Sequence, residues 1–137
     1  MRTVEIEVGR CLDGSVSASP DSAVPILPSS DLARTADFLA YLGLRIALRT
    51  QDYLQATLGD LELHYYLASG VDEGTNPAGC LLRVNDPDHQ RAVWCDDGVE
   101  CLEVPAPGAY GSTTFAVIDP DGNLLRVGHV LETAASG

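Results

Sequence analysis

The chain has 137 residues, enough for one compact domain or for two small modules that share a core. Hydrophobic residues make up 45% of it, and no apolar run approaches the length of a membrane span. We therefore expect a soluble, cytoplasmic, globular protein without a secretory signal or a membrane partner. Twenty acidic residues against eight basic ones give a formal charge of −12. This charge disfavours nucleic acid and anionic lipid and is compatible with a cationic ligand.

Residues 1–22 differ from the rest of the chain and are predicted to be an N-terminal extension. Thr3 to Val8 alternates apolar and polar residues, as a half-buried edge strand does, and a loop rich in Gly, Ser, Asp and Pro follows. Four cysteines show no spacing typical of a metal site, which favours reduced thiols. They are Cys11, Cys80, Cys95 and Cys101, and Cys80 lies within an apolar run, as a small core residue would.

Residues 23–70 predict one strand, one helix and three further strands. The first strand, Ala23–Leu27, contains Pro25, which places it at an edge or crossing point because proline cannot donate to a ladder. Ser29 and Ser30 can cap the helix, with Asp31 in its first turn. The helix is predicted from Leu32, Ala36, Leu39 and Leu42, with Gly43 ending it, and the strands are Arg45–Thr50, Tyr53–Leu58 and Leu61–Leu67.

Residues 71–137 begin with a polar linker and repeat the same order of elements. Gly79–Val84 predicts a strand, and Asp86 followed by Pro87 has the chemistry of a helix start. Ala92 and Val93 are assigned to the apolar side of this helix, and Asp96–Gly98 to its end. A final hairpin, Phe115–Gly128, turns at the sequence Asp-Pro-Asp-Gly-Asn. The fold class is therefore α+β, with two tandem β-α-β-β-β modules that read as an internal duplication.

This pattern resembles the glyoxalase/bleomycin resistance/dioxygenase (vicinal oxygen chelate) superfamily over about residues 23–131. The stretches Ala23–Leu32, Leu58–Tyr66 and Tyr110–Ala116 are most similar to bleomycin resistance proteins. The resemblance implies a homodimer whose curved mixed sheets enclose binding grooves between the subunits. It also implies that Pro25 permits exchange of the first strand between subunits.

The superfamily's metal site separates its enzymes from its binding proteins. At the positions where the enzymes carry metal ligands, this chain has Val24, Gly79 and Arg126. None of them coordinates a hard or borderline cation, and the arginine repels one. We therefore expect a protein that binds without a metal or cofactor and is not an enzyme. A metalloenzyme (a lyase, isomerase or dioxygenase) that uses Glu62 and His64 is the alternative, and a binding domain for regulation or storage is a third.

The resemblance also implies which residues contact a small-molecule ligand. Tyr53 and Tyr110 match aromatic contacts of these proteins. Apart from the resemblance, carboxylates such as Asp37 and Asp52 would attract a cationic, aromatic ligand. Leu81 and Leu48 stand where a bleomycin binder carries Trp and Phe. The full predicted site is Asp37, Leu48, Asp52, Tyr53, His64, Tyr66, Leu81, Tyr110 and Gly111.

Overall fold

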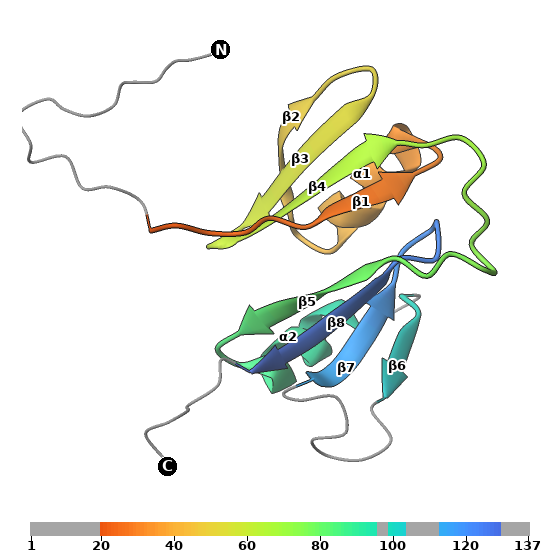
Figure 1. Ribbon diagram of the computed structural model, residues 1–137. Helices are drawn as coiled ribbons and strands as arrows, with labels where there is room; N and C mark the ends of the chain where they lie inside the picture. The colour runs from red at the N-terminus through yellow and green to blue at the C-terminus, as the bar shows by residue number, and fades with distance from the viewer. Residues whose placement is uncertain (1–19, 96–98, 104–112, 130–137) are drawn as a thin grey trace, which may run out of the picture.

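The two halves of the chain have the same order of elements in the computed structural model, which describes residues 20–95, 99–103 and 113–129 (Figure 1). The strands of the first half pair in the order β1-β4-β3-β2, and those of the second half in the order β5-β8-β7-β6. Each sheet has one parallel pair, β1 with β4 and β5 with β8. The predicted α+β class and tandem modules are confirmed. The elements are β1 (Ile26–Ser29), α1 (Leu32–Tyr41), β2 (Arg45–Arg49), β3 (Tyr53–Leu58), β4 (Leu61–Leu67), β5 (Gly79–Val84), α2 (Pro87–Trp94), β6 (Cys101–Glu103), β7 (Thr113–Ile118) and β8 (Leu124–His129).

The N-terminus of α1 is capped by Asp31, not by the serines before it. The Asp31 carboxylate accepts hydrogen bonds from the backbone N–H groups of Ala33 (3.0 Å) and Arg34 (3.2 Å). Its extended backbone, with φ −152° and ψ 100°, is the conformation of an N-cap. The Ser29 hydroxyl hydrogen-bonds to the Thr35 hydroxyl, and the Ser30 hydroxyl donates to Asp121. The predicted role of these two serines as caps is therefore wrong. The predicted end is confirmed, because Gly43 follows the helix with φ +94°.

The second helix starts as predicted but buries different residues. Asp86 is its N-cap and accepts from the N–H of His89 at 3.1 Å, and a proline follows in the first turn. Ala92 and Val93 are exposed, whereas Trp94 is buried and donates its indole N–H to the carbonyl of Leu42 at 2.9 Å. The predicted apolar side was therefore wrong. The predicted stop at residues 96–98 lies outside the described residues.

Strand β1 begins later than predicted, at Ile26. Pro25 therefore lies just before the strand, where the missing N–H interrupts no ladder. Its carbonyl still accepts from the N–H of His64 at 3.0 Å, which extends the contact with β4 by one residue. Within this single chain β1 pairs with its own β4, and exchange of the strand between subunits stays a prediction.

Each sheet turns one face toward its own helix and leaves the other face open. Figure 1 shows α1 and α2 behind their sheets. Alternate residues of β3 and β4 are fully buried on the helix side, because side chains alternate along a strand. The residues between them, including Tyr53 and Tyr66, lie on the opposite side. We call this side the open face of the first sheet, and the side of the second sheet with Leu81 and Leu102 its open face. The buried core comprises Leu27, Leu32, Ala36, Leu39, Leu42, Leu44, Leu54, Ala56, Leu63, Tyr65, Leu82, Trp94, Phe115, Val117, Leu125 and Val127.

The turn between β7 and β8 joins the two modules. Within it, Asp119 accepts from the hydroxyl of Tyr65 at 3.0 Å and from the amide of Asn123 at 2.8 Å. The same Asn123 amide donates to the carbonyl of Pro28 at 2.9 Å, so one side chain bridges both halves. Burial raises the pKa of Asp119, and burial together with Asp119 raises that of Tyr65 well above its usual value. These polar groups are buried but hydrogen-bonded. Because the turn at residues 119–123 bonds both modules, we call it the clasp.

A second residue of this turn extends the clasp to α1. Asp121 is 2% exposed, and its Oδ1 accepts from the Ser30 hydroxyl at 2.5 Å and from the Arg34 guanidinium at 3.1 Å. Ser30 is thus used as a donor across 91 residues of sequence instead of as a helix cap. Asn76, from the segment between β4 and β5, donates to the carbonyl of Asp121 at 3.0 Å. The two modules and the segment that connects them all meet at this turn.

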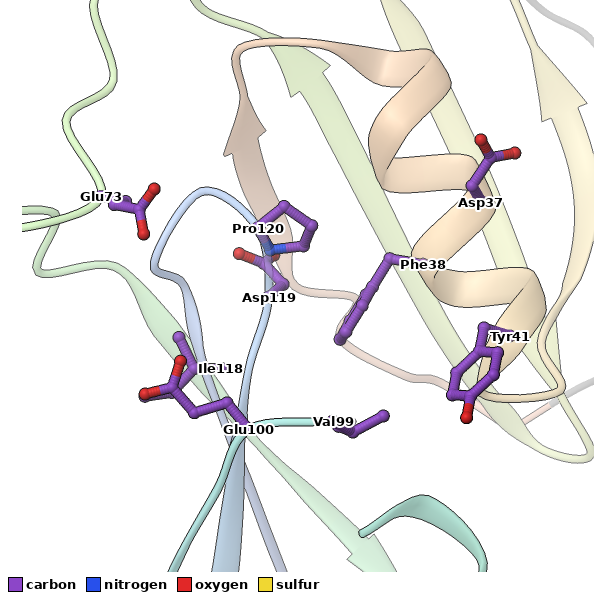
Figure 2. A pocket seen from close by; sticks show the side chains of 9 residues that line it. All are labelled: Asp37, Phe38, Tyr41, Glu73, Val99, Glu100, Ile118, Asp119 and Pro120. Atoms are coloured by element: carbon purple, nitrogen blue, oxygen red, sulfur yellow. The ribbon is translucent and has the colours of Figure 1, made fainter. Parts of the chain in front are cut away.

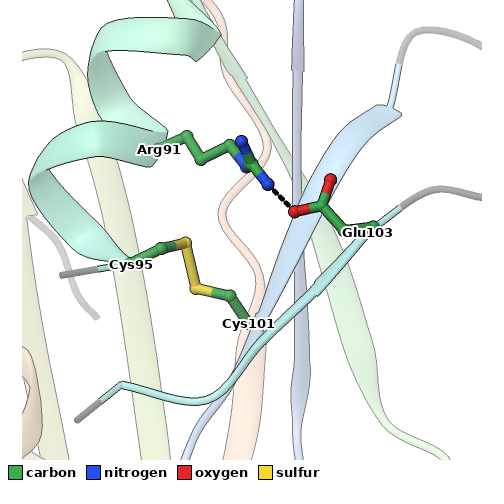
Figure 3. The surroundings of a disulfide bond; sticks show 4 residues. All are labelled: Arg91, Cys95, Cys101 and Glu103. Atoms are coloured by element: carbon green, nitrogen blue, oxygen red, sulfur yellow. Dashed lines mark ion pairs between the residues drawn. A yellow bond between two sulfur atoms is a disulfide. The ribbon is translucent and has the colours of Figure 1, made fainter. Parts of the chain in front are cut away.

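A disulfide joins Cys95, the residue that follows α2, to Cys101 at the start of β6 (Figure 3). The expectation of reduced thiols is therefore wrong for this pair. The return of the chain from α2 into β6 brings the two residues together across a sequence separation of 6. An ion pair between Arg91 and Glu103 spans the same two elements beside it. Cys80 is free and half-buried against the core, as predicted, and burial raises the pKa of its thiol to about 11.

The described residues include no helix that is both long and apolar enough to cross a membrane.

Candidate functional site

Three aromatic side chains of the predicted site lie together on the open face of the first sheet. Tyr53 of β3 pairs with Tyr66 of β4. His64 lies on β4, two residues before Tyr66. Tyr66 is 44% exposed, whereas Tyr53 and His64 are half-buried. The alternation of β4 places Glu62, His64 and Tyr66 on one side, and the antiparallel register brings Tyr53 up to them.

A continuous hydrogen-bonded chain connects three of these groups. The Tyr53 hydroxyl lies 2.7 Å from Nδ1 of His64, and Nε2 of His64 lies 2.7 Å from Oε2 of Glu62. The two rings meet edge to face, with their centroids 5.3 Å apart and their planes at 82°. We call this chain the Glu62–His64–Tyr53 relay. Sequence reasoning named all three residues, but it did not predict that they are bonded in series.

The relay engages both ring nitrogens of His64. To bind a metal, this histidine would have to give up its hydrogen bond either to Glu62 or to Tyr53. Within the described ranges, no group of three or more His, Cys, Asp or Glu residues is arranged to hold a metal ion.

The structure also describes the three residues that the resemblance matched to metal ligands. Val24 is half-buried just before β1, and Arg126 lies on β8 opposite Leu81 of β5. Gly79 starts β5 so close to β8 that a Cβ atom built on it would lie 2.4 Å from the carbonyl oxygen of Leu124. No side chain fits at this position while the two strands keep their pairing.

Several further residues of the predicted site lie on the open faces or at their rims. Leu48 of β2 is 44% exposed opposite Gln55, and Leu81 of β5 is 41% exposed. Asp52 is exposed in the turn before Tyr53, where it accepts from the Thr50 hydroxyl at 3.1 Å. The two remaining residues of the predicted groove, Tyr110 and Gly111, lie outside the described residues.

Asp37 is the one described residue of the predicted site that lies elsewhere. It is on α1, which covers the opposite face of the first sheet, so the sheet separates it from the relay. There it lines a cleft of about 590 Å³ between α1 and the second module (Figure 2). The cleft was not predicted, although Asp37 and Tyr41, one helical turn apart and both exposed, were a signal for it. Its lining is Asp37, Phe38, Tyr41, Glu73, Val99, Glu100, Ile118, Asp119 and Pro120.

Comparison with known proteins identifies the family of the chain. The family model described as Glyoxalase/Bleomycin resistance protein/Dioxygenase superfamily matches residues 21–127. A bleomycin resistance protein of Klebsiella pneumoniae is 32% identical over 114 residues, 78% of this chain and 90% of that protein.

Two solved structures have a fold similar to that of this chain. The crystal structure of a bleomycin resistance determinant encoded on the transposon Tn5 has a TM-score of 0.73 and 30% identity, and covers 80% of this chain and 98% of that one. The structure of a bleomycin-binding protein complexed with bleomycin has a TM-score of 0.72 and 30% identity, with 82% and 100% covered. The chain thus belongs to the glyoxalase/bleomycin resistance protein/dioxygenase superfamily.

Proposed function

We propose that this protein binds a bleomycin-type antibiotic and protects by sequestration, without converting the ligand chemically. The observation that carries the proposal is the likeness to a bleomycin-binding protein solved with bleomycin, which is 30% identical and matched over its whole length. The match covers 82% of this chain and 100% of the other, so we expect the ligand-binding surface to be retained along with the fold.

The open face of the first sheet has the composition that such a ligand needs. Tyr53 and Tyr66 offer aromatic surface for stacking, and the relay adds polar atoms that orient a ligand. The Asp52 carboxylate at the rim and the formal charge of −12 favour a cationic ligand. These features support a ligand that is both aromatic and positively charged.

We further propose that two copies of the chain complete the groove. Large apolar side chains are exposed on the open faces of both sheets, among them Ile26 at 52% and Leu48, Leu81 and Leu102 at 41–44%. Exposed apolar side chains on both faces are suited to contact with another protein chain. In this arrangement, the segment that ends at Pro25 is the hinge at which the first strand passes between subunits.

Titration calorimetry with bleomycin tests the binding site. Tyr66→Ala should weaken binding by about 1–3 kcal/mol and hardly change the melting of the unliganded protein, because the exposed ring loses contact with water only under a ligand. Tyr41→Ala is the matched control, an exposed tyrosine on α1 that lines the cleft behind the sheet. If Tyr41→Ala weakens binding and Tyr66→Ala does not, the ligand occupies the cleft. Absence of bleomycin binding to the wild type would refute the proposed function.

Sedimentation of the same samples tests the assembly. We expect twice the chain mass at micromolar concentration, and a compact monomer would contradict a groove built by two copies.

A further inference from the structure

The proton on Nε2 of His64 is fixed by its partner. A carboxylate accepts hydrogen bonds and donates none when ionised, and Oε2 of Glu62 lies 2.7 Å from Nε2. This nitrogen must therefore carry a proton, whatever the charge of the ring. A carboxylate that selects the tautomer of a histidine in this way is a recurrent device in proteins.

The role of the Tyr53 hydroxyl follows from this tautomer. In a neutral imidazole with a proton on Nε2, Nδ1 has only a lone pair to offer. The 2.7 Å contact between Nδ1 and the Tyr53 oxygen is then satisfied only if the phenol donates its single proton to His64. The phenol oxygen has no other proton, so toward a ligand it presents lone pairs alone.

Protonation of His64 reverses this polarity without moving a heavy atom. Nδ1 then carries a proton and donates to the phenol oxygen, and the phenol proton turns outward to the ligand. The phenol oxygen is thus a hydrogen-bond acceptor while the imidazole is neutral and a donor when the imidazole is charged.

The neighbours of His64 add few competing charges. Across the strands it faces Ile26 of β1 and Gln55 of β3, and Tyr66 lies next on its own strand. The charged groups nearest to it in the strand register are Glu62 and Arg45. Arg45 of β2 lies in the same row as Glu62, with Thr57 of β3 between them. Asp52 precedes Tyr53 at the rim. Glu62 is therefore the one charge bonded to the ring.

We propose that Glu62 and His64 act as positioning residues that make Tyr53 a hydrogen-bond acceptor, so that the site selects a ligand group with an N–H donor, such as an amide, ammonium or amidinium. This inference rests on the proposed function, because it names what the binding site recognises. It assigns to Tyr53 a polar role that is separate from stacking.

The first measurement examines the relay without a ligand. Long-range ¹H–¹⁵N correlation spectra distinguish the two tautomers of histidine, and a His64→Gln variant identifies the signal among the three histidines of the chain. At pH 8 the wild type should show the proton on Nε2. Glu62→Ala should shift His64 toward a mixture of tautomers, whereas Asp60→Ala, the loss of an exposed acid in the adjacent turn, should leave it unchanged. A proton on Nδ1 in the neutral wild type overturns the proposal.

The second measurement uses bleomycin as the probe. Tyr53→Phe keeps the ring and removes the hydroxyl, so the ratio of its Kd to that of the wild type reports the hydrogen bond alone. Because both proteins bind the same ligand, protonation of bleomycin itself cancels in this ratio. We expect a ratio of roughly tenfold at pH 8. A ratio near one at pH 8 overturns the inference and leaves the proposed function standing.

A failure of the proposed function has a different signature. If bleomycin does not bind the wild type at any pH, the proposed function falls and the selection of a donor group falls with it. The polarity of Tyr53 is then judged by the spectra alone.

Discussion

Gly122 offers a test of the clasp between the modules, because two separate constraints meet at this residue. Its φ is +84°, in the left-handed region, and a Cβ atom added to it would lie 2.4 Å from the backbone oxygen of Glu73 and 2.9 Å from the Glu73 Cα. Glu73 belongs to the segment between β4 and β5. Gly122→Ala therefore has to bear the left-handed conformation and also displace the backbone of that segment.

Gly70 separates these two constraints. It has the same φ of +84°, and a Cβ atom on it would meet nothing within 4 Å. Gly70→Ala should lower the free energy of unfolding by about 1 kcal/mol. The left-handed conformation of alanine destabilises the folded state, and the lower entropy of the unfolded chain offsets part of this loss. Overpacking against a backbone adds about 1–3 kcal/mol. Gly122→Ala should therefore cost about 2–4 kcal/mol.

Urea unfolding followed by circular dichroism measures both variants. At a slope of about 1–3 kcal/mol per molar urea, the expected difference separates the two midpoints by roughly 1 M. Equal losses of stability in Gly122→Ala and Gly70→Ala would refute the close contact with Glu73, and with it the reasoning that the turn holds the modules together by direct packing.

Two further predictions concern buried polar and covalent links. Tyr65→Phe should lose about 1 kcal/mol at pH 7, because Asp119 loses a donor, and should show a weaker fall of stability in titrations above pH 10. The sign follows from the raised pKa of Tyr65, since the unfolded chain loses the phenol proton first and stability declines as pH rises through this range. Reducing the bond between Cys95 and Cys101 should cost about 2 kcal/mol by loop closure. Dithiothreitol should accordingly lower the melting temperature of the wild type and leave the double serine variant of this pair unchanged.

The strands and turns could be predicted because their signals are local. Hairpins are specified by a few turn residues between apolar runs, and the boundaries of β3, β4 and β5 agree with the pattern. Prediction failed where a partner lies far away in the sequence. Ser30 has the residue type of a helix cap, but its hydroxyl donates a hydrogen bond to Asp121, which is 91 residues away in the sequence. Val93 was misassigned because α2 has only eight residues, too few to define an apolar face.

The residues of the candidate site were named from the resemblance, not from local pattern. Alternation along β4 accounts for Glu62, His64 and Tyr66 lying on one face. The contact of Tyr53 with His64 depends on the register between β3 and β4, and the sequence pattern does not define it to the atom. Asp37 was grouped with them as a nearby carboxylate for a cationic ligand, whereas packing of α1 against the sheet sets it on the other side.

The geometry around Gly79 bears on the prediction that this chain binds no metal. At Val24 and Arg126, a single substitution could introduce a side chain able to bind one. At Gly79 it could not, because any Cβ atom there would lie 2.4 Å from the carbonyl oxygen of Leu124, closer than real Cβ contacts come. A side chain here would require β5 to move away from β8, a pairing that contributes six register partners to the second sheet. The close approach of the two strands therefore supports the prediction that residue 79 holds no metal ion.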